Sequence, residues 1–174
     1  MNIQTLKILR FLSLAVAGLV LACAMSSASA AGAPGQNTDE QAANSFRLND
    51  KVITEYTAVL KNLIAFRKQY PEVAKQMDKD GADNQTIAQA TAMIDKYPQA
   101  RDAITRTGMS VTDYITCSFA VVLTGTRAMT ISQGASASSV PSGVATDNLR
   151  YYMANKAKFD ALSKLMAQMS SDSD

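Results

Sequence analysis

The sequence contains no histidine. Histidine is the side chain that most often serves as a general base near neutral pH and as a ligand of transition metals. Its absence excludes the serine and cysteine nucleophile systems that depend on a histidine base. A zinc site would need a cluster of cysteine or histidine, and the two cysteines of the chain do not form one. We therefore expect no enzyme activity, no metal site and no cofactor.

Catalysis by carboxylates alone survives in principle, because it needs no histidine. The chain has 15 Asp and Glu residues. Most of them fall on the surfaces or at the starts of the predicted helices, where solvation and capping explain them. A carboxylate-based enzyme is therefore kept only as a third hypothesis, behind two binding functions.

Charge is absent from the apolar stretch at residues 11–25. Lys7 and Arg10 precede this stretch, and small residues follow it at the −3 and −1 positions of a cut after Ala30. This order is typical of a secretory signal peptide, and the apolar run is short for a membrane span. We predict that residues 1–30 are a signal peptide and that the mature protein is periplasmic.

A second reading of the same region concerns Cys23. The segment LVLAC at 19–23 loosely resembles the sequence at which bacterial lipoproteins are cleaved and lipidated. The usual order is Leu-Ala/Ser-Gly/Ala-Cys. Val20 and Leu21 occupy its −3 and −2 positions, so this order is only half met. A lipoprotein anchored through Cys23 stays open as the alternative.

The mature chain also lacks a cluster of basic residues. The full sequence has 17 basic and 15 acidic residues, and Lys7 and Arg10 leave with the signal peptide, so 15 of each sign remain. A neutral chain without a basic cluster lacks the electrostatic surface that nucleic acid or anionic lipid requires. No later apolar stretch approaches the roughly eighteen residues of a membrane span. We expect no nucleic-acid partner and no membrane span in the mature chain.

Only Cys117 remains after cleavage at the signal peptide, so no internal disulfide can form, although an exported protein would permit one. The neighbours of this thiol, YITCSFAVVL, are mostly apolar. Cysteine in such surroundings usually packs as a small hydrophobic side chain. We predict that Cys117 is buried and structural.

No segment shows the two-residue alternation of a half-buried strand, whereas apolar residues recur at helical spacing. The pattern predicts an all-α single-domain bundle over residues 46–169, preceded by a flexible leader at 31–45 and followed by a disordered acidic tail at 170–174. The segment 111–131 is apolar on nearly every side, which is typical of a central helix. The predicted helices, about six in number, are 50–69, 71–80, 84–96, 98–107, 111–131 and 146–169.

The ends of these helices carry local signals. Residues 70–81 and 97–108 each begin with Tyr-Pro and end with Gly. Proline suits the first helical position, the residue before it leaves the preceding helix, and glycine closes a helix in a left-handed conformation. The two segments therefore predict short helices instead of a repeated functional module. Asn49, Ser110 (with an acidic residue three positions on) and Thr146 are the predicted N-caps.

Residues 78–89, DKDGADNQTIAQ, imitate an EF-hand calcium loop. Their first four residues match its common DxDG opening. The fifth position is Ala82, the sixth is Asp83 where glycine is required, and the twelfth is Gln89 where a bidentate glutamate belongs. A turn between helices explains the segment better, and we expect no calcium site.

Four polar residues are the candidates for a ligand site. Arg127 lies in the apolar central helix, and Asn148 and Asn155 lie seven residues apart on one face of the last helix, with Tyr152 between them. If that face points inward, these side chains converge on a polar pocket between the two helices. The alternative is that Arg127 extends to the surface and that the amides cap loops or meet water.

Three longer stretches resemble a group of small, uncharacterised, signal-bearing proteins of Gram-negative bacteria. They are LNDKVITEY, YPQARDAITRTGMSVTDY and VPSGVATDNLRYYMANKAKFDAL. The shared motifs are the helix start at Pro98, the Gly-Met-Ser segment at 108–114 and the Pro-x-Gly-Val segment at 141–149, and the likeness covers about residues 48–166. The resemblance implies a periplasmic location and an α-helical fold. Its motifs mark helix ends, so it implies no activity and no substrate.

These observations favour an exported, non-enzymatic helical protein that acts by interaction with a protein or another component of the envelope. The alternative is a small-molecule binding protein that uses the polar pocket between the central and last helices. An enclosed cavity lined by the four polar residues would favour the second, and a filled bundle would favour the first.

Overall fold

The computed structural model describes residues 36–81, 86–134, 136 and 140–171, with side chains from Thr38 to Met169 within those ranges. The predicted signal peptide, Cys23 and residues 172–174 lie outside this part of the chain. Every regular element within it is an α-helix, which confirms the all-α class. The helices are α2 (Gln36–Ser45), α3 (Asp50–Gln69), α4 (Pro71–Gly81), α5 (Ile87–Asp95), α6 (Pro98–Thr105), α7 (Val111–Ser132), α8 (Val144–Ala154) and α9 (Lys156–Ser171).

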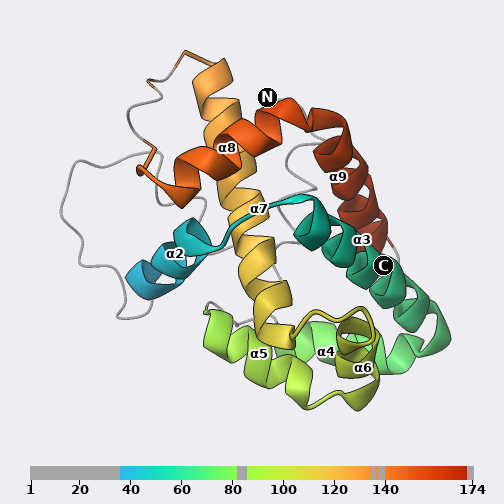
Figure 1. Cartoon of the computed structure of the whole chain (residues 1–174). Helices are drawn as coiled ribbons and strands as arrows, with labels where there is room; N and C mark the ends of the chain where they lie inside the picture. The colour runs from blue at the N-terminus through green and yellow to red at the C-terminus, as the bar shows by residue number, and fades with distance from the viewer. Residues whose placement is uncertain (1–35, 82–85, 135, 137–139, 172–174) are drawn as a thin grey trace.

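Helix α7 runs through the middle of the molecule (Figure 1). It packs against α2, α3, α5, α6 and α8, so it is covered from several directions, as its nearly continuous apolar surface predicts. Helices α4, α5 and α6 gather at its N-terminal end, α8 crosses it nearer its C-terminal end, and α3 and α9 lie side by side along one flank (Figure 1). Cys117 in this helix is fully buried, which confirms the predicted burial of this thiol.

By length and composition, α7 is the one helix of the described residues that could cross a membrane, with a mean hydropathy of 1.3 over its best window. Half of that window is buried inside the protein. The core helix of a soluble protein passes the same test, so this finding is weak evidence for a span. The packing of five helices around α7 accounts for its composition.

Two predicted helix starts are confirmed by their hydrogen bonds. The side chain of Asn49 accepts from the Val52 amide at 3.0 Å, and that of Ser110 accepts from the Asp113 amide at 3.0 Å. The second half of a capping box is replaced at α7 by a bond from the Ser110 hydroxyl to the Asp113 carboxylate at 2.7 Å. Thr86, which falls inside the predicted helix 84–96, forms a complete capping box at the start of α5.

The two Tyr-Pro segments form short helices, as predicted, but they end differently. Gly108 follows α6 with a φ of 93°, the left-handed conformation that glycine adopts without strain. Gly81 is instead the last residue of α4 and is buried. Gly81 and Gly108, which stand at equal distances from the two Tyr-Pro pairs, therefore have different structural roles.

The prediction of a flexible leader at 31–45 is wrong for its described part. Residues 36–45 form α2, which packs against α7 and α8. This helix has no apolar side chain larger than alanine, so no helical stripe is visible in its sequence. Its position depends on polar contacts with distant residues, described below.

The prediction of one last helix at 146–169 is also wrong. It is two helices, broken at Asn155, whose backbone leaves the helical region at φ −120° and ψ 29°. Thr146 is not the N-cap, because α8 begins two residues earlier at Val144, directly after Gly143 with a φ of 82°. The second helix continues through Ser171, which leaves only residues 172–174 of the predicted tail outside the described chain.

The core joins α3, α5, α6, α7 and α9. Helix α3 packs against α6 on one side and α9 on another, α5 packs against α7, and buried residues from all five helices close the interior. The largest side chains with less than 2% exposure are Tyr56, Val59, Leu60, Ile104, Cys117, Asn148 and Leu162. Asn148 is the one amide in this set.

Candidate functional site

Asn148 is 1% exposed and lies on α8. Its side-chain oxygen accepts from the Leu48 amide at 2.8 Å, and its side-chain nitrogen donates to the Phe46 carbonyl at 2.8 Å. Because its oxygen and nitrogen are both hydrogen-bonded within the chain, this buried amide is satisfied without a ligand. Asn148 therefore holds the connection between α2 and α3 in place.

Arg127 also reaches toward the N-terminal segment, and not toward the last helix. Its guanidinium donates to the Asn44 side-chain oxygen at 2.6 Å and pairs with the Glu40 carboxylate at 3.3 Å, both on α2. The side chain is 17% exposed. Desolvation lowers the pKa of Arg127, while Glu40 acts in the opposite direction. The group keeps its charge and uses it to bind α2.

Tyr152 and Asn155 have separate tasks. The ring of Tyr152 lies against α7 at Gly125, where a side-chain Cβ would be 3.7 Å from the ring, and it contacts the Phe159 ring at a centroid distance of 4.5 Å. Asn155 donates to the Tyr151 carbonyl at 2.9 Å and ends α8. These contacts place one residue between helices and the other at the corner between α8 and α9.

The four candidate residues are thus not gathered around one pocket. Arg127 and Asn148 both bind the segment at residues 40–48, which occupies the place where the sequence pattern predicts a ligand. Tyr152 packs between helices, and Asn155 bonds to the backbone of its own helix. Their assignment as ligand-binding residues stays a prediction, and each is already occupied by this chain's own groups.

A buried ion pair joins α3 to α4, and the sequence pattern does not reveal it. The guanidinium of Arg67, whose side chain is 6% exposed, binds both carboxylate oxygens of Asp78, one of them at 2.8 Å. A charged residue near a helix end is expected on the outer surface. A signal was nevertheless present, because position 67 continues the inward stripe of Tyr56, Leu60 and Leu63 at helical spacing.

Next to this pair lies a small group of buried hydroxyls. Tyr56 and Tyr114 stack at a centroid distance of 5.7 Å, and the Tyr56 hydroxyl donates to Ser118 at 3.1 Å. Burial raises the pKa of Tyr114 to about 12, and burial raises the pKa of Tyr56 well above its usual value. Burial likewise raises the pKa of the Cys117 thiol. These groups stay protonated near neutral pH, so none is an activated nucleophile.

The segment that imitates a calcium loop is engaged in helix contacts. Asp78 binds Arg67, and Asp80 accepts hydrogen bonds from the Tyr97 hydroxyl and the Gln76 amide, each at 2.6 Å. The bond from Tyr97 is the main cause that lowers the pKa of Asp80. Residues 82–85 lie outside the described chain. Over the described residues, no group of three or more His, Cys, Asp or Glu is close enough to hold a metal ion.

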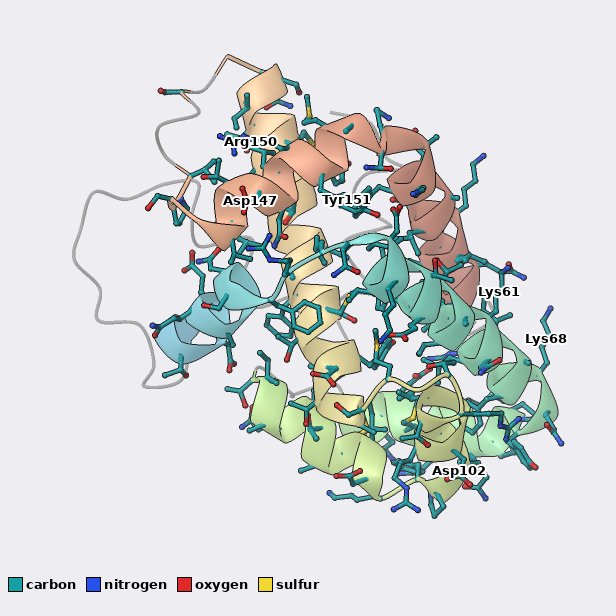
Figure 2. All side chains as sticks on the ribbon, in the orientation of Figure 1. Lys61, Lys68, Asp102, Asp147, Arg150 and Tyr151 are labelled. Atoms are coloured by element: carbon teal, nitrogen blue, oxygen red, sulfur yellow. The ribbon has the colours of Figure 1, made fainter. Side chains whose placement is uncertain are left out.

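A charged network covers the junction of α3, α8 and α9 on the surface. The Asp50 carboxylate accepts from the Tyr151 hydroxyl and from Lys158, each at 2.5 Å. These bonds, with that of Lys158 the largest, lower the pKa of Asp50. Figure 2 shows Asp147 and Arg150 together on the outer side of α8, where they are 3.3 Å apart. The network fastens helices together and leaves its charges in water.

No protein-family model, curated protein or solved structure matches this chain.

Proposed function

We propose that this chain is an exported, non-enzymatic helical protein that acts in the envelope of a Gram-negative cell by binding another protein. One observation carries the proposal: the polar side chains of the interior serve the fold. Asn148, Arg127 and the pair of Arg67 and Asp78 each bind another part of the same chain. The predicted signal peptide and the family resemblance support the location.

The interior therefore offers little to a small molecule, and the surface is the part left for recognition. Met129 on α7 and Met153 on α8 are 47% and 59% exposed. Met129 is one helical turn beyond Gly125, and Met153 follows Tyr152, so both lie near the place where the Tyr152 ring meets α7. Flexible thioether side chains adapt to varied partner surfaces.

The alternative of a small-molecule pocket between α7 and α8 is less well supported. It needs Arg127, Asn148, Tyr152 and Asn155 to face a common space. Arg127 and Asn148 instead bind the segment at residues 40–48, and a ligand would have to displace that segment before reaching them.

Site-specific photo-crosslinking tests the proposal. A photoreactive amino acid replaces Met129 or Met153 in the full precursor, and cells of the source organism are irradiated. We expect adducts with a discrete envelope protein from these two positions. The matched control replaces Lys79, an exposed residue of α4 at the far end of the bundle, and should give no adduct.

Two further measurements separate the alternatives. Native mass spectrometry of the purified protein should show no tightly bound metabolite. A metabolite that copurifies with the protein, together with an absence of adducts at both methionines, would favour the small-molecule function. The intact mass of the exported protein should correspond to a chain that begins at Ala31, whereas an acylated N-terminus at Cys23 would show a lipoprotein.

A further inference from the structure

Helix α2 differs from the other helices in what holds it. Its sequence, QNTDEQAANS, has no apolar side chain beyond two alanines, and of its described side chains only Ala43 is buried. An isolated helix of ten residues is marginal in water even with a favourable composition. Its helical state therefore depends on its contacts with the rest of the molecule.

Three of those contacts are polar, one of them exposed and two partly buried. Arg127 on α7 binds Asn44 at 2.6 Å and Glu40 at 3.3 Å. The Asp39 carboxylate accepts from the Ile87 amide, the first of α5, at 3.0 Å. Water and salt compete for such bonds, so they stabilise an element less than an apolar face does.

The chain changes character directly after α2. Phe46 and Leu48 are held by Asn148, Leu48 is 4% exposed in the core, and Asn49 caps α3. Phe46, Leu48 and Asn49 are thus tied to the core or to α3, whereas α2 contributes Ala43 alone to the core. The boundary of a local opening would therefore lie between Ser45 and Phe46.

The face of α7 beneath α2 is mostly apolar around Arg127. Arg127 marks this face, and the helical period places Ala120, Leu123 and Ile131 within about 40° of it. Leu123 and Ile131 are already partly exposed with α2 in place. Without α2, the face would present an apolar stripe around a guanidinium that has lost two partners.

We infer that α2 is a releasable cover of α7, which detaches and loses its helical form as one unit, with the boundary at residues 45–46, and then refolds onto α7 while the remaining helices stay folded. Release uncovers the surface around Arg127. This inference concerns a conformational device and does not depend on the proposed protein-binding function, since α2 can open whether or not a partner follows.

Hydrogen exchange of the full mature chain, read by mass spectrometry, tests the inference. Amides of α2 should exchange much faster than those of α3 and of the middle of α7, because they exchange by local opening. The variants Glu40→Gln and Asn44→Ala each remove a contact with Arg127. We expect exchange in α2 to rise about fivefold or more, with α3 unchanged. Raising the salt concentration to about 1 M should increase the exchange rate of α2 amides in the wild type, because salt screens the ion pair between Glu40 and Arg127.

The matched control is Glu72→Gln, which removes an exposed pair with Lys75 on α4, a helix that does not pack on α2. This variant should leave exchange in α2 unchanged. The inference is overturned if α2 amides exchange at the rate of α3 amides, which would mean that α2 opens only on global unfolding. It is equally overturned if Glu40→Gln speeds α3 and α7 as much as α2.

Discussion

At the scale of single residues, Asn148 shows how one buried amide organises the chain. It satisfies one backbone donor at Leu48 and one backbone acceptor at Phe46, both of which would otherwise lose water without a partner. Leaving a buried polar group unpaired costs about 1–3 kcal/mol. The Asn148 side chain therefore stabilises the fold mainly through the two backbone groups that it hydrogen-bonds, and less through its own burial.

We predict that Asn148→Ala lowers the free energy of unfolding by about 2–4 kcal/mol, since it leaves two backbone groups unpaired. Urea unfolding followed by circular dichroism measures the change. The control is Asn155→Ala in the same part of the chain, which removes one bond to the carbonyl of the half-buried Tyr151 and should cost about 1 kcal/mol or less. Equal losses in the two variants would refute the assigned role of Asn148.

At the scale of elements, Gly125 and Gly108 differ in how the fold would respond to a larger side chain. Gly125 lies within α7, and a Cβ there would meet the Tyr152 ring at 3.7 Å, an ordinary van der Waals distance. Gly108 lies between α6 and α7 with a φ of 93°, and a Cβ there would meet nothing within 4 Å. Gly125 lowers the helix propensity of α7, whereas Gly108 adopts without strain a conformation that would strain a larger residue.

We predict that Gly125→Ala stabilises the protein by up to about 1 kcal/mol, because alanine is the better helix former and the ring leaves room for a methyl group. Gly108→Ala should destabilise it by about 1–2 kcal/mol, through strain alone. Thermal unfolding of both variants beside the wild type gives the comparison. A loss of stability in Gly125→Ala would show that the Tyr152 ring leaves no room for a methyl group between α7 and α8.

The helix ends show which elements the sequence can predict. Asn49 and Ser110 act on amides three residues away, so their caps are visible locally. The break at Asn155 has no proline or glycine to announce it. It occurs where α8, packed across α7, gives way to α9, packed along α3, and that change of partner is a tertiary requirement.

At the scale of the whole molecule, buried phenols couple stability to pH. The pKa of Tyr114 in the folded protein is about 12, raised by burial from the ordinary value of 10. The unfolded chain gives up this proton first, so the stabilisation is present below about pH 10 and is lost as the pH rises from 10 toward 12. Tyr56 adds to the same trend, because burial raises its pKa as well.

We therefore predict a loss of stability between pH 10 and pH 12 that is smaller in Tyr114→Phe than in the wild type, by on the order of 2 kcal/mol at the upper end. The measurement is urea unfolding across that range, in which the slopes with pH are compared and not the absolute values. The control is Tyr70→Phe, since Tyr70 is 36% exposed. The same slope in Tyr114→Phe and Tyr70→Phe would contradict the prediction.

The candidate site shows the limit of sequence patterns. Helical periodicity correctly predicted that Arg127 lies in α7 and that Asn148 and Tyr152 share a helix. It could not show which groups these side chains contact. The partners of Arg127 and Asn148 lie 83 and 100 residues away in the sequence. Because α2 lacks an apolar stripe, nothing in its own residues announces that it folds back over α7.

The sequence by itself determined the helical class, the central place of α7, the starts of α3, α4, α6 and α7 and the burial of Cys117, since periodicity and capping act over a few neighbouring residues. Only the tertiary structure decided that α2 is a helix docked on Arg127, that Arg67 pairs with Asp78 in the interior, and that the last helix breaks at Asn155. These features depend on groups that are distant in sequence and meet only once the helices have packed. The polar contacts that looked like a binding site are, for that reason, the contacts that hold this fold together.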